Sequence, residues 1–425
     1  MSEFERERQN KRKQSEIKDL TMKDSAEVKY KGNQLLDKSS KISKEELIAK
    51  GTSLHAQGNI LEAAKYYQYF INQGYIDEKV FANFGSILNN LGKLKKAEVY
   101  TRKAIKIKPD FPEAYYNLGC ILKDLNKLEQ AEIETRKAIQ LKNNFPEAYY
   151  NLGCILKDLN KLEQAQIETR KAIQLKNDFP EAYYNLGCIL RDLNKLEQAE
   201  TETRRAIKLK PNFIMALNNL GSILSDLGKY KEAEDFLRKS INIDPNYAIA
   251  YSNLGNILNK IGKPNEAERS IREAIKIDKN LAEAHLNLGN ILKDLGKYKE
   301  AEFHSRQAIK INPNLVIAYN NLGSLLHETG NLKEAEYFFH KATQLKPDFA
   351  DAYSNLGNIL YSLNKFNEAI ASYNKAINLK KEYNQCLVGI GKVLLKQGKH
   401  QEGLEKLKEG DGYISFNLEE GLSIN

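Results

Sequence analysis

The sequence predicts an all-α solenoid, a chain of stacked helical hairpins that share no single closed core. Three observations predict it. A glycine recurs every 34 residues, and two apolar stripes of helical period fill each interval. One position in the break between the two stripes holds only Gly or Asn. A fixed period of this length is the signature of repeat architectures, in which each unit buries its apolar side by stacking on its neighbours.

The recurring glycine defines eleven units over residues 44–417, and we number each unit so that this glycine is position 8. The unit that starts at residue 112 recurs almost unchanged at residue 146, and a more diverged copy follows at residue 180. Because no insertion interrupts the series, we expect one continuous array. The glycines are Gly51, Gly85, Gly119, Gly153, Gly187, Gly221, Gly255, Gly289, Gly323, Gly357 and Gly391.

Each unit contains two apolar stripes with the spacing of an α-helix. In residues 112–145, the first stripe is Ala114, Leu118, Ile121, Leu122 and Leu125. The second stripe, after a short break, is Leu128, Ala131, Ala138, Ile139 and Leu141. We therefore expect two helices per unit, and we expect Gly at position 8 and Ala at position 20 to allow these helices a close approach.

The break between the stripes predicts a tight turn. Position 15 holds only Gly or Asn, the residues that tolerate the left-handed conformation that ends a helix. Any other residue there is expected to cost about 1–2 kcal/mol of stability. Position 32 is often proline, which ends the second helix. The position-15 residues are Gly58, Gly92, Asn126, Asn160, Asn194, Gly228, Gly262, Gly296, Gly330, Asn364 and Gly398.

These residues resemble the tetratricopeptide repeat, which has an aromatic at position 4, Leu at 7, Gly at 8, Ala at 20 and 27, and Pro at 32. The resemblance implies a right-handed superhelix of hairpins whose first helices line the concave surface. The chain departs from the pattern at His285 and Leu217 in position 4, and it has Thr at position 24 in the near-identical copies. Gly403 and Gly410 replace Ala in the last unit, so we expect its second helix to be weak.

Asparagine at position 6 is the candidate binding feature. At about 100° per residue, this position faces away from the apolar stripe, and a carboxamide offers both a donor and an acceptor to a peptide backbone. With helices stacked at roughly 10 Å and an extended chain rising about 3.3 Å per residue, one amide meets about every third peptide residue. The asparagines are Asn83, Asn117, Asn151, Asn185, Asn219, Asn253, Asn287, Asn321 and Asn355.

Two interpretations of this row are equally supported by the sequence. The row resembles the asparagine ladder of O-linked N-acetylglucosamine transferases, which implies binding of extended peptide main chain. Alternatively, Asn is the usual family residue here and serves solubility or hydrogen bonding between helices. The first interpretation predicts that Ala at Asn151, Asn185 and Asn219 leaves stability nearly unchanged and weakens binding of a client.

Neighbouring positions are expected to supply selectivity. Tyr116, Tyr150 and Tyr184 occupy position 5, either as a binding strip or packed against the next helix. Cys120, Cys154 and Cys188 occupy position 9, and later units place Asn256, Asn290 and Asn358 there. Pairs such as Arg136-Lys137 near the ends of second helices are interpreted as solvated outer surface.

The sequence shows no chemistry beyond binding. Its four cysteines form no CxxC pair, its six histidines have no metal-ligand spacing, and no nucleotide-binding or nucleophile motif is present. We therefore expect no catalytic residue, no metal, no cofactor and no enzymatic activity. The net charge of +9 is modest for 425 residues, so we expect no nucleic-acid partner.

The two ends of the chain lie outside the repeats. Residues 1–43 form a charged tail with a net charge of +3, interpreted as flexible or as a solvated helix. Residues 418–425 form a short C-terminal tail, and the preceding Tyr413–Phe416 is either a capping strand or a frayed end. No stretch has the apolar length of a signal peptide or membrane span, and a cytoplasmic location is the default.

The sequence thus predicts a non-catalytic scaffold that binds protein or peptide clients along a concave groove. The alternative is an accessory recognition arm for a glycosyltransferase or other transferase that acts in trans. A transferase that co-purifies with the chain would favour this alternative.

Overall fold

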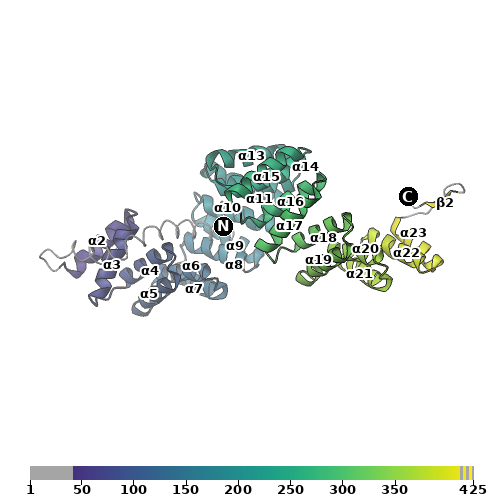
Figure 1. Ribbon diagram of the computed structural model, residues 1–425. Coiled ribbons are helices and arrows are strands. Elements are labelled where there is room, and N and C mark those ends of the chain that lie inside the picture. Colours follow the sequence, from purple (N-terminus) through teal and green to yellow (C-terminus); the bar gives the residue numbers. More distant parts are fainter. Residues whose placement is uncertain (1–41, 412–414, 418–420, 424–425) are drawn as a thin grey trace. The chain divides into compact units, whose positions relative to one another are not determined.

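Eleven helical hairpins follow one another in the computed structural model, which describes residues 42–411, 415–417 and 421–423 (Figure 1). The first helices are α2 (Lys44–Ala56), α4 (Glu78–Asn90), α6 (Pro112–Asp124), α8 (Pro146–Asp158), α10 (Pro180–Asp192), α12 (Ile214–Asp226), α14 (Ala248–Lys260), α16 (Ala282–Asp294), α18 (Val316–Glu328), α20 (Ala350–Ser362) and α22 (Asn384–Lys396). This series confirms the all-α solenoid.

The second helix of each hairpin follows after a three-residue connection. These helices are α3 (Ile60–Asn72), α5 (Leu94–Ile107), α7 (Leu128–Leu141), α9 (Leu162–Leu175), α11 (Leu196–Leu209), α13 (Tyr230–Ile243), α15 (Pro264–Ile277), α17 (Tyr298–Ile311), α19 (Leu332–Leu345), α21 (Phe366–Leu379) and α23 (His400–Asp411). Although α23 contains two glycines, it is helical to Asp411, and its expected weakness stays a prediction.

The left-handed turn is confirmed in every hairpin. All eleven position-15 residues have positive φ, between 56° and 59° for the four asparagines and between 71° and 80° for the seven glycines. In this conformation the chain leaves the first helix and reverses into the second. The spacing of Gly and Asn in the sequence therefore locates every hairpin.

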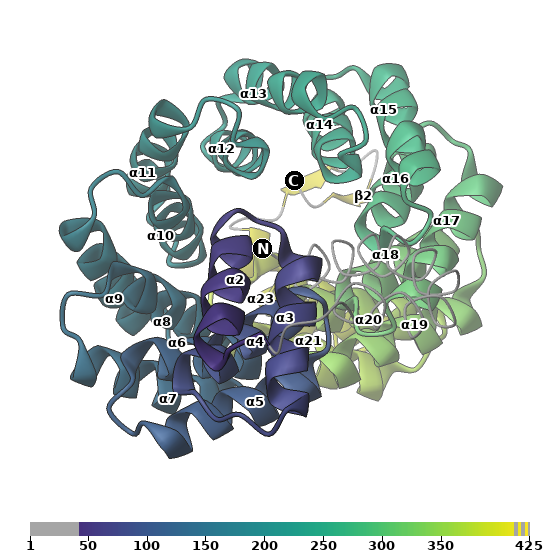
Figure 2. The same cartoon turned by 90° about the vertical axis from the view of Figure 1, so that its left-hand side faces the viewer.

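The chain divides into two compact units, residues 1–211 and 212–425. Inside each unit, every first helix contacts its own second helix, and from α4 onward it also contacts the first helix of the next hairpin. In the second unit, α12, α14 and α16 lie on the inner side, while α13, α15 and α17 lie on the outer side (Figure 2). The first helices therefore share one surface, as the sequence predicts.

The buried side chains are largely those of the predicted stripes. Ala114, Leu118, Ile121 and Leu122 are fully buried, and Ala at position 20 is buried in ten hairpins. Leu141 was predicted to be buried but is 36% exposed, because it lies in the last turn of α7. The core is thus a row of small clusters between successive helices, as expected of an array stabilised by nearest neighbours.

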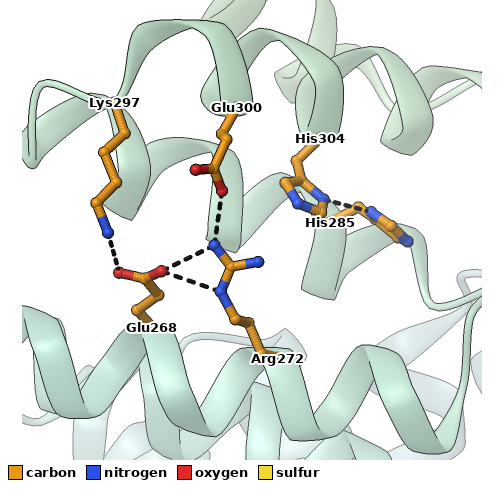
Figure 3. Close-up of polar contacts among 6 residues, drawn as sticks. All are labelled: Glu268, Arg272, His285, Lys297, Glu300 and His304. Carbon is orange, nitrogen blue, oxygen red and sulfur yellow. Dashed lines mark hydrogen bonds and ion pairs between the residues drawn. The ribbon is translucent and has the colours of Figure 1, made fainter.

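Ion pairs connect the outer helices of successive hairpins. In the second unit, Arg272 binds Glu268 on its own helix at 2.8 Å and Glu300 on α17 at 2.7 Å, while Lys297 binds Glu268 at 2.9 Å (Figure 3). Burial of Glu268 opposes ionisation, but the hydrogen bonds from Lys297 and Arg272 outweigh it and lower the pKa of this carboxyl. Such networks favour one register between hairpins.

Arg136 makes the same connection in the first unit. It binds Glu132 at 3.0 Å and Glu168 of the next hairpin at 3.2 Å, while the adjacent Lys137 is exposed. Both residues of this pair therefore reach solvent, and Arg136 also connects two hairpins.

The described C-terminal residues form a small hairpin. Strand β1 (Ser415–Asn417) pairs antiparallel with β2 (Gly421–Ser423), with Phe416 opposite Leu422. The sequence left Tyr413–Phe416 open between a capping strand and a frayed end. Ser415 and Phe416 belong to β1, whereas Tyr413 and Ile414 lie outside the described residues, as does most of the predicted N-terminal tail.

Candidate functional site

The position-6 asparagines lie on the first helices from α4 to α20. Three of them, Asn151, Asn185 and Asn219, are buried, with 3%, 7% and 8% of their surface exposed. The other six are half-buried and keep part of their surface open. The row is therefore continuous along each unit, but its members are not equally accessible.

In the first unit, three of the four position-6 asparagines bind the second helix of the preceding hairpin. Asn151 Nδ2 donates to Thr135 Oγ1 at 3.3 Å, and Asn185 Nδ2 donates to Thr169 Oγ1 at the same distance. Asn83 Nδ2 likewise donates to a hydroxyl at position 24, that of Tyr67, at 3.3 Å. The amides of these three residues thus link one hairpin to the next.

The threonines at position 24 have a clear packing role. A Cβ added to Gly119 would lie 2.1 Å from Thr135 Oγ1, so the threonine lies directly against the glycine of its own hairpin. The same contact recurs between Gly153 and Thr169. The departure of these copies from the family's aromatic residue therefore gives the next asparagine a hydroxyl partner inside the interface.

In the second unit, the asparagine binds the first helix of the preceding hairpin. Asn253 Nδ2 donates to Asn218 Oδ1 at 2.9 Å and to Ser222 Oγ at 3.3 Å. Three further bonds repeat this pattern at 2.9–3.3 Å, and all acceptors lie at position 5 or 9. They are Asn287 to Ser252, Asn321 to Asn290 and Asn355 to Asn320.

These bonds change one sequence-based expectation. Ala at Asn151 and Asn185 was expected to leave stability nearly unchanged, but each side chain is buried and bonded to a threonine. Removing such a side chain leaves a buried hydroxyl without its partner and typically costs about 1 kcal/mol or more. Asn219 is also buried, and its Nδ2 has no hydrogen-bond partner among the described residues. Tests of binding therefore belong at more open positions.

Position 9 provides such positions. Asn256 and Asn358 are exposed and Asn290 is half-buried. Asn290 Oδ1 accepts from Asn321, and Asn358 Oδ1 accepts from the Tyr373 hydroxyl at 2.7 Å. A hydrogen bond to its oxygen therefore fixes the orientation of each of these two amides.

The tyrosines at position 5 are half-buried and packed against the following residues of the array. The Tyr116 and Phe145 rings lie 5.1 Å apart, as do the Tyr150 and Phe179 rings. The Tyr184 hydroxyl hydrogen-bonds to the Cys188 thiol. The rings therefore have a packing role, and a part of each remains accessible.

Two of the position-9 cysteines, Cys120 and Cys188, are poor nucleophiles in this environment, because burial raises the pKa of each thiol. Burial raises the pKa of the Cys120 thiol to about 11, so it is protonated at neutral pH. Among the described residues, no three His, Cys, Asp or Glu side chains are grouped as a metal site. Over the same residues, no helix has the length and apolar character that crossing a bilayer requires.

The structure also shows a histidine pair that the sequence analysis missed. His285 on α16 and His304 on α17 place their Nδ1 atoms 3.0 Å apart (Figure 3). They occupy positions 4 and 23 of one hairpin, which are 19 residues apart and face each other across it. The departure of His285 from the aromatic pattern was visible in the sequence, but its partner was not sought at position 23.

Comparison with protein families decides the nature of the array. Models described as tetratricopeptide repeats match residues 78–111, 100–133, 146–179, 180–213, 212–280, 248–314 and 280–348, and one described as a TPR repeat matches residues 357–398. Together they span more than half of the chain. The chain belongs to the tetratricopeptide repeat family. Proteins built from tetratricopeptide repeats typically bind protein partners, so the array is a protein-interaction scaffold.

Comparison with individual proteins adds less. No curated protein sequence matches the tetratricopeptide chain. Among solved structures, it is similar to one titled "Functional Characterization of Pseudomonas Aeruginosa pilF", with 20% identity and a TM-score of 0.42. That alignment covers 48% of this chain and 92% of the other.

Proposed function

We propose that this tetratricopeptide chain is a non-catalytic scaffold that binds extended peptide or protein segments along the surface of its first helices. The observation that supports this most is the sideways pairing of amides and hydroxyls from α12 to α20. Positions 5, 6 and 9 of these helices carry Asn or Ser, with Leu286 as the exception, and none is charged. A neutral row of donors and acceptors suits main chain rather than charged side chains.

The hydrogen bonds within the row prepare it for a ligand. A carboxamide has two N–H donors and one oxygen acceptor. In Asn287, one N–H is donated to Ser252, and this bond fixes the direction of the rest of the half-buried amide. Since the orientation is set before binding, less side-chain entropy is lost when a peptide arrives.

The proposed binding surface comprises the nine position-6 asparagines, the three position-5 tyrosines, and Asn256, Asn290 and Asn358. In it, the half-buried and exposed amides contact the client, while buried Asn151 and Asn185 hold adjacent hairpins in register and buried Asn219 is closed to a client. The high pKa of Cys120 favours a binding role over a catalytic one. The alternative function, recognition on behalf of a transferase in trans, uses the same surface and predicts that a transferase co-purifies with the chain.

An array of unstructured synthetic peptides tests the binding mode. We expect binding with broad sequence tolerance that falls about tenfold or more when the peptide backbone is N-methylated, since methylation removes the main-chain donors. Substitution of Asn256, Asn290 and Asn358 by Ala should weaken the binding of the same peptides. A matched variant changes three exposed outer-surface asparagines, Asn242, Asn265 and Asn378, to Ala and should bind normally. Equal binding of methylated and unmethylated peptides would overturn main-chain recognition.

A further inference from the structure

Helix α5, together with the residue on either side of it, carries most of the net charge of this protein. Residues 93–108 contain seven basic residues and one acidic residue, a net charge of +6 out of +9 for the whole chain. The N-terminal tail accounts for the remaining +3, so the rest of the chain is neutral. This concentration distinguishes one helix from the other outer helices.

The lysines of α5 form one continuous surface. Lys95, Lys96, Lys103 and Lys106 are all exposed, and at 100° per residue they lie within about 120° of the helix surface. The one acidic residue of the helix, Glu98, lies to the side of this sector and is bound to Arg102 at 3.1 Å and to Lys127 at 2.9 Å. None of the four lysines forms an ion pair with a carboxylate among the described residues.

One aliphatic side chain, Val99, lies among these lysines, and a second, Ile107, lies at the edge of their sector. Val99 is 53% exposed and Ile107 is 41% exposed. Lys103 Nζ lies 5.1 Å from the centre of the Tyr100 ring, so part of this lysine rests on the aromatic surface. The surface therefore alternates cations with apolar groups, which is the composition of helices that lie at membrane interfaces.

The other second helices lack this composition. Helix α5 has lysine at both position 18 and position 19. Each of the other second helices has a glutamate at one of these two positions. These residues are Glu62, Glu129, Glu163, Glu197, Glu232, Glu266, Glu300, Glu334, Glu368 and Glu402. The absence of an acid at these two positions is thus particular to α5 and does not follow from the repeat.

We propose that the outer surface of α5 docks on an anionic lipid bilayer. The lysines attract acidic headgroups, and Val99 and Ile107 enter the headgroup region between them. A flat bilayer suits this surface because α5 is an outer helix, whereas the peptide-binding surface is formed by first helices. Docking therefore leaves the proposed groove of the same hairpins open, and it is independent of what that groove binds.

Sedimentation with lipid vesicles tests the proposal on the full chain. We expect binding to phosphatidylcholine vesicles that contain phosphatidylserine, little binding to phosphatidylcholine alone, and weakening as salt is raised. The affinity of the variant K95Q/K96Q/K106Q for these vesicles should fall by about tenfold or more, since the attractions of the individual lysines add in free energy. Lys103 is left in place because of its contact with Tyr100.

A control variant removes the same charge elsewhere. K231Q/K299Q/K333Q changes three exposed lysines at position 18 of α13, α17 and α19, each followed by a glutamate, and should bind vesicles like the unmodified chain. V99S/I107S should weaken binding without changing net charge. Equal losses in the two lysine variants, or binding to RNA or acidic peptides with no binding to the vesicles, would overturn the proposal.

Discussion

The histidine pair shows how two side chains define each other's protonation. His285 Nε2 lies 3.2 Å from the carbonyl oxygen of Lys279, which only accepts, so this nitrogen carries the proton. In a neutral ring Nδ1 is then an acceptor, and His304 Nδ1–H donates to it at 3.0 Å. The hydrogen bond needs one of the two Nδ1 atoms to lack a proton, so it is lost when both rings are protonated.

Acid is expected to destabilise this hairpin. Burial, then the charge of a protonated His285 and of Arg272, lower the pKa of His304 to about 4, and burial also lowers the pKa of His285. Glu300 faces His304 and Asp278 faces His285, but their opposing effects are smaller. The unfolded state, with a pKa near 6.5, binds more protons, so the free energy of unfolding falls as pH drops from about 6.5 towards 4. Urea unfolding at pH 7 and pH 5 measures this.

The next hairpin supplies a control for this prediction. Tyr319 and Phe338 occupy the two equivalent positions there, with ring centres 6.2 Å apart. The double variant H285Y/H304F should therefore fold and should lose part of the dependence on pH between 7 and 5. A residual dependence from His55 is expected, because burial lowers its pKa too. An unchanged dependence in the variant would contradict this origin.

At the scale of the helical hairpin, the choice of residue at the turn is set by backbone conformation and not by side-chain packing. Gly228 has φ of 74°, and a Cβ added there would meet no atom within 4 Å. Gly228→Val should thus lower the free energy of unfolding by about 1–2 kcal/mol through backbone strain. Gly228→Asn is the matched control, since Asn126 adopts φ of 58° at the equivalent turn, and it should cost much less. Urea denaturation of both variants checks this, and an unchanged midpoint for the valine variant would refute strain at the turn.

The same scale shows what the sequence could predict. The turn at position 15 and the buried stripe at Leu118 and Ile121 follow from local rules, because backbone conformation and helical period are properties of one unit. The hydrogen bonds of the asparagines are not local. Asn151 binds a threonine on a second helix, whereas Asn287 binds a serine on a first helix. The hydrogen-bond partner of each asparagine depends on the residues at positions 5, 9 and 24 of the preceding unit. These partners could therefore be assigned only from the three-dimensional structure.

For the whole molecule, total composition concealed the distribution of charge. A net charge of +9 over 425 residues is modest, yet +6 of it lies in residues 93–108. The ion pairs of the other outer helices, such as Arg136 with Glu132 and Glu168, cancel locally and connect hairpins. The array therefore combines hairpins of small net charge, whose outer ion pairs largely cancel, with one hairpin whose outer surface is basic.

Nearest-neighbour construction predicts that one hairpin can be removed without loss of the fold. Deletion of residues 146–179 joins Phe145 to Pro180. The new junction is again Phe-Pro, the same dipeptide as Phe145-Pro146 in the full chain. Thr135 then meets Asn185, Arg136 meets Glu202, and Lys195 meets Glu132, so each contact is rebuilt by an equivalent residue. Arg170 already pairs with Glu202 at 3.6 Å in the full chain. We expect the same helicity per residue by circular dichroism and a urea m-value reduced in proportion to the surface lost.

The contrasting deletion removes half a hairpin. Without residues 146–162, α9 loses the helix that covers its apolar stripe, and Ala165 and Ala172 have no first helix of their own to pack on. This chain should lose helicity and unfold over a broader range of urea, because a mismatched helix interrupts the stacking on both sides. If the two deletion variants showed the same helicity and the same breadth of urea unfolding, contacts beyond nearest neighbours would have to stabilise the array.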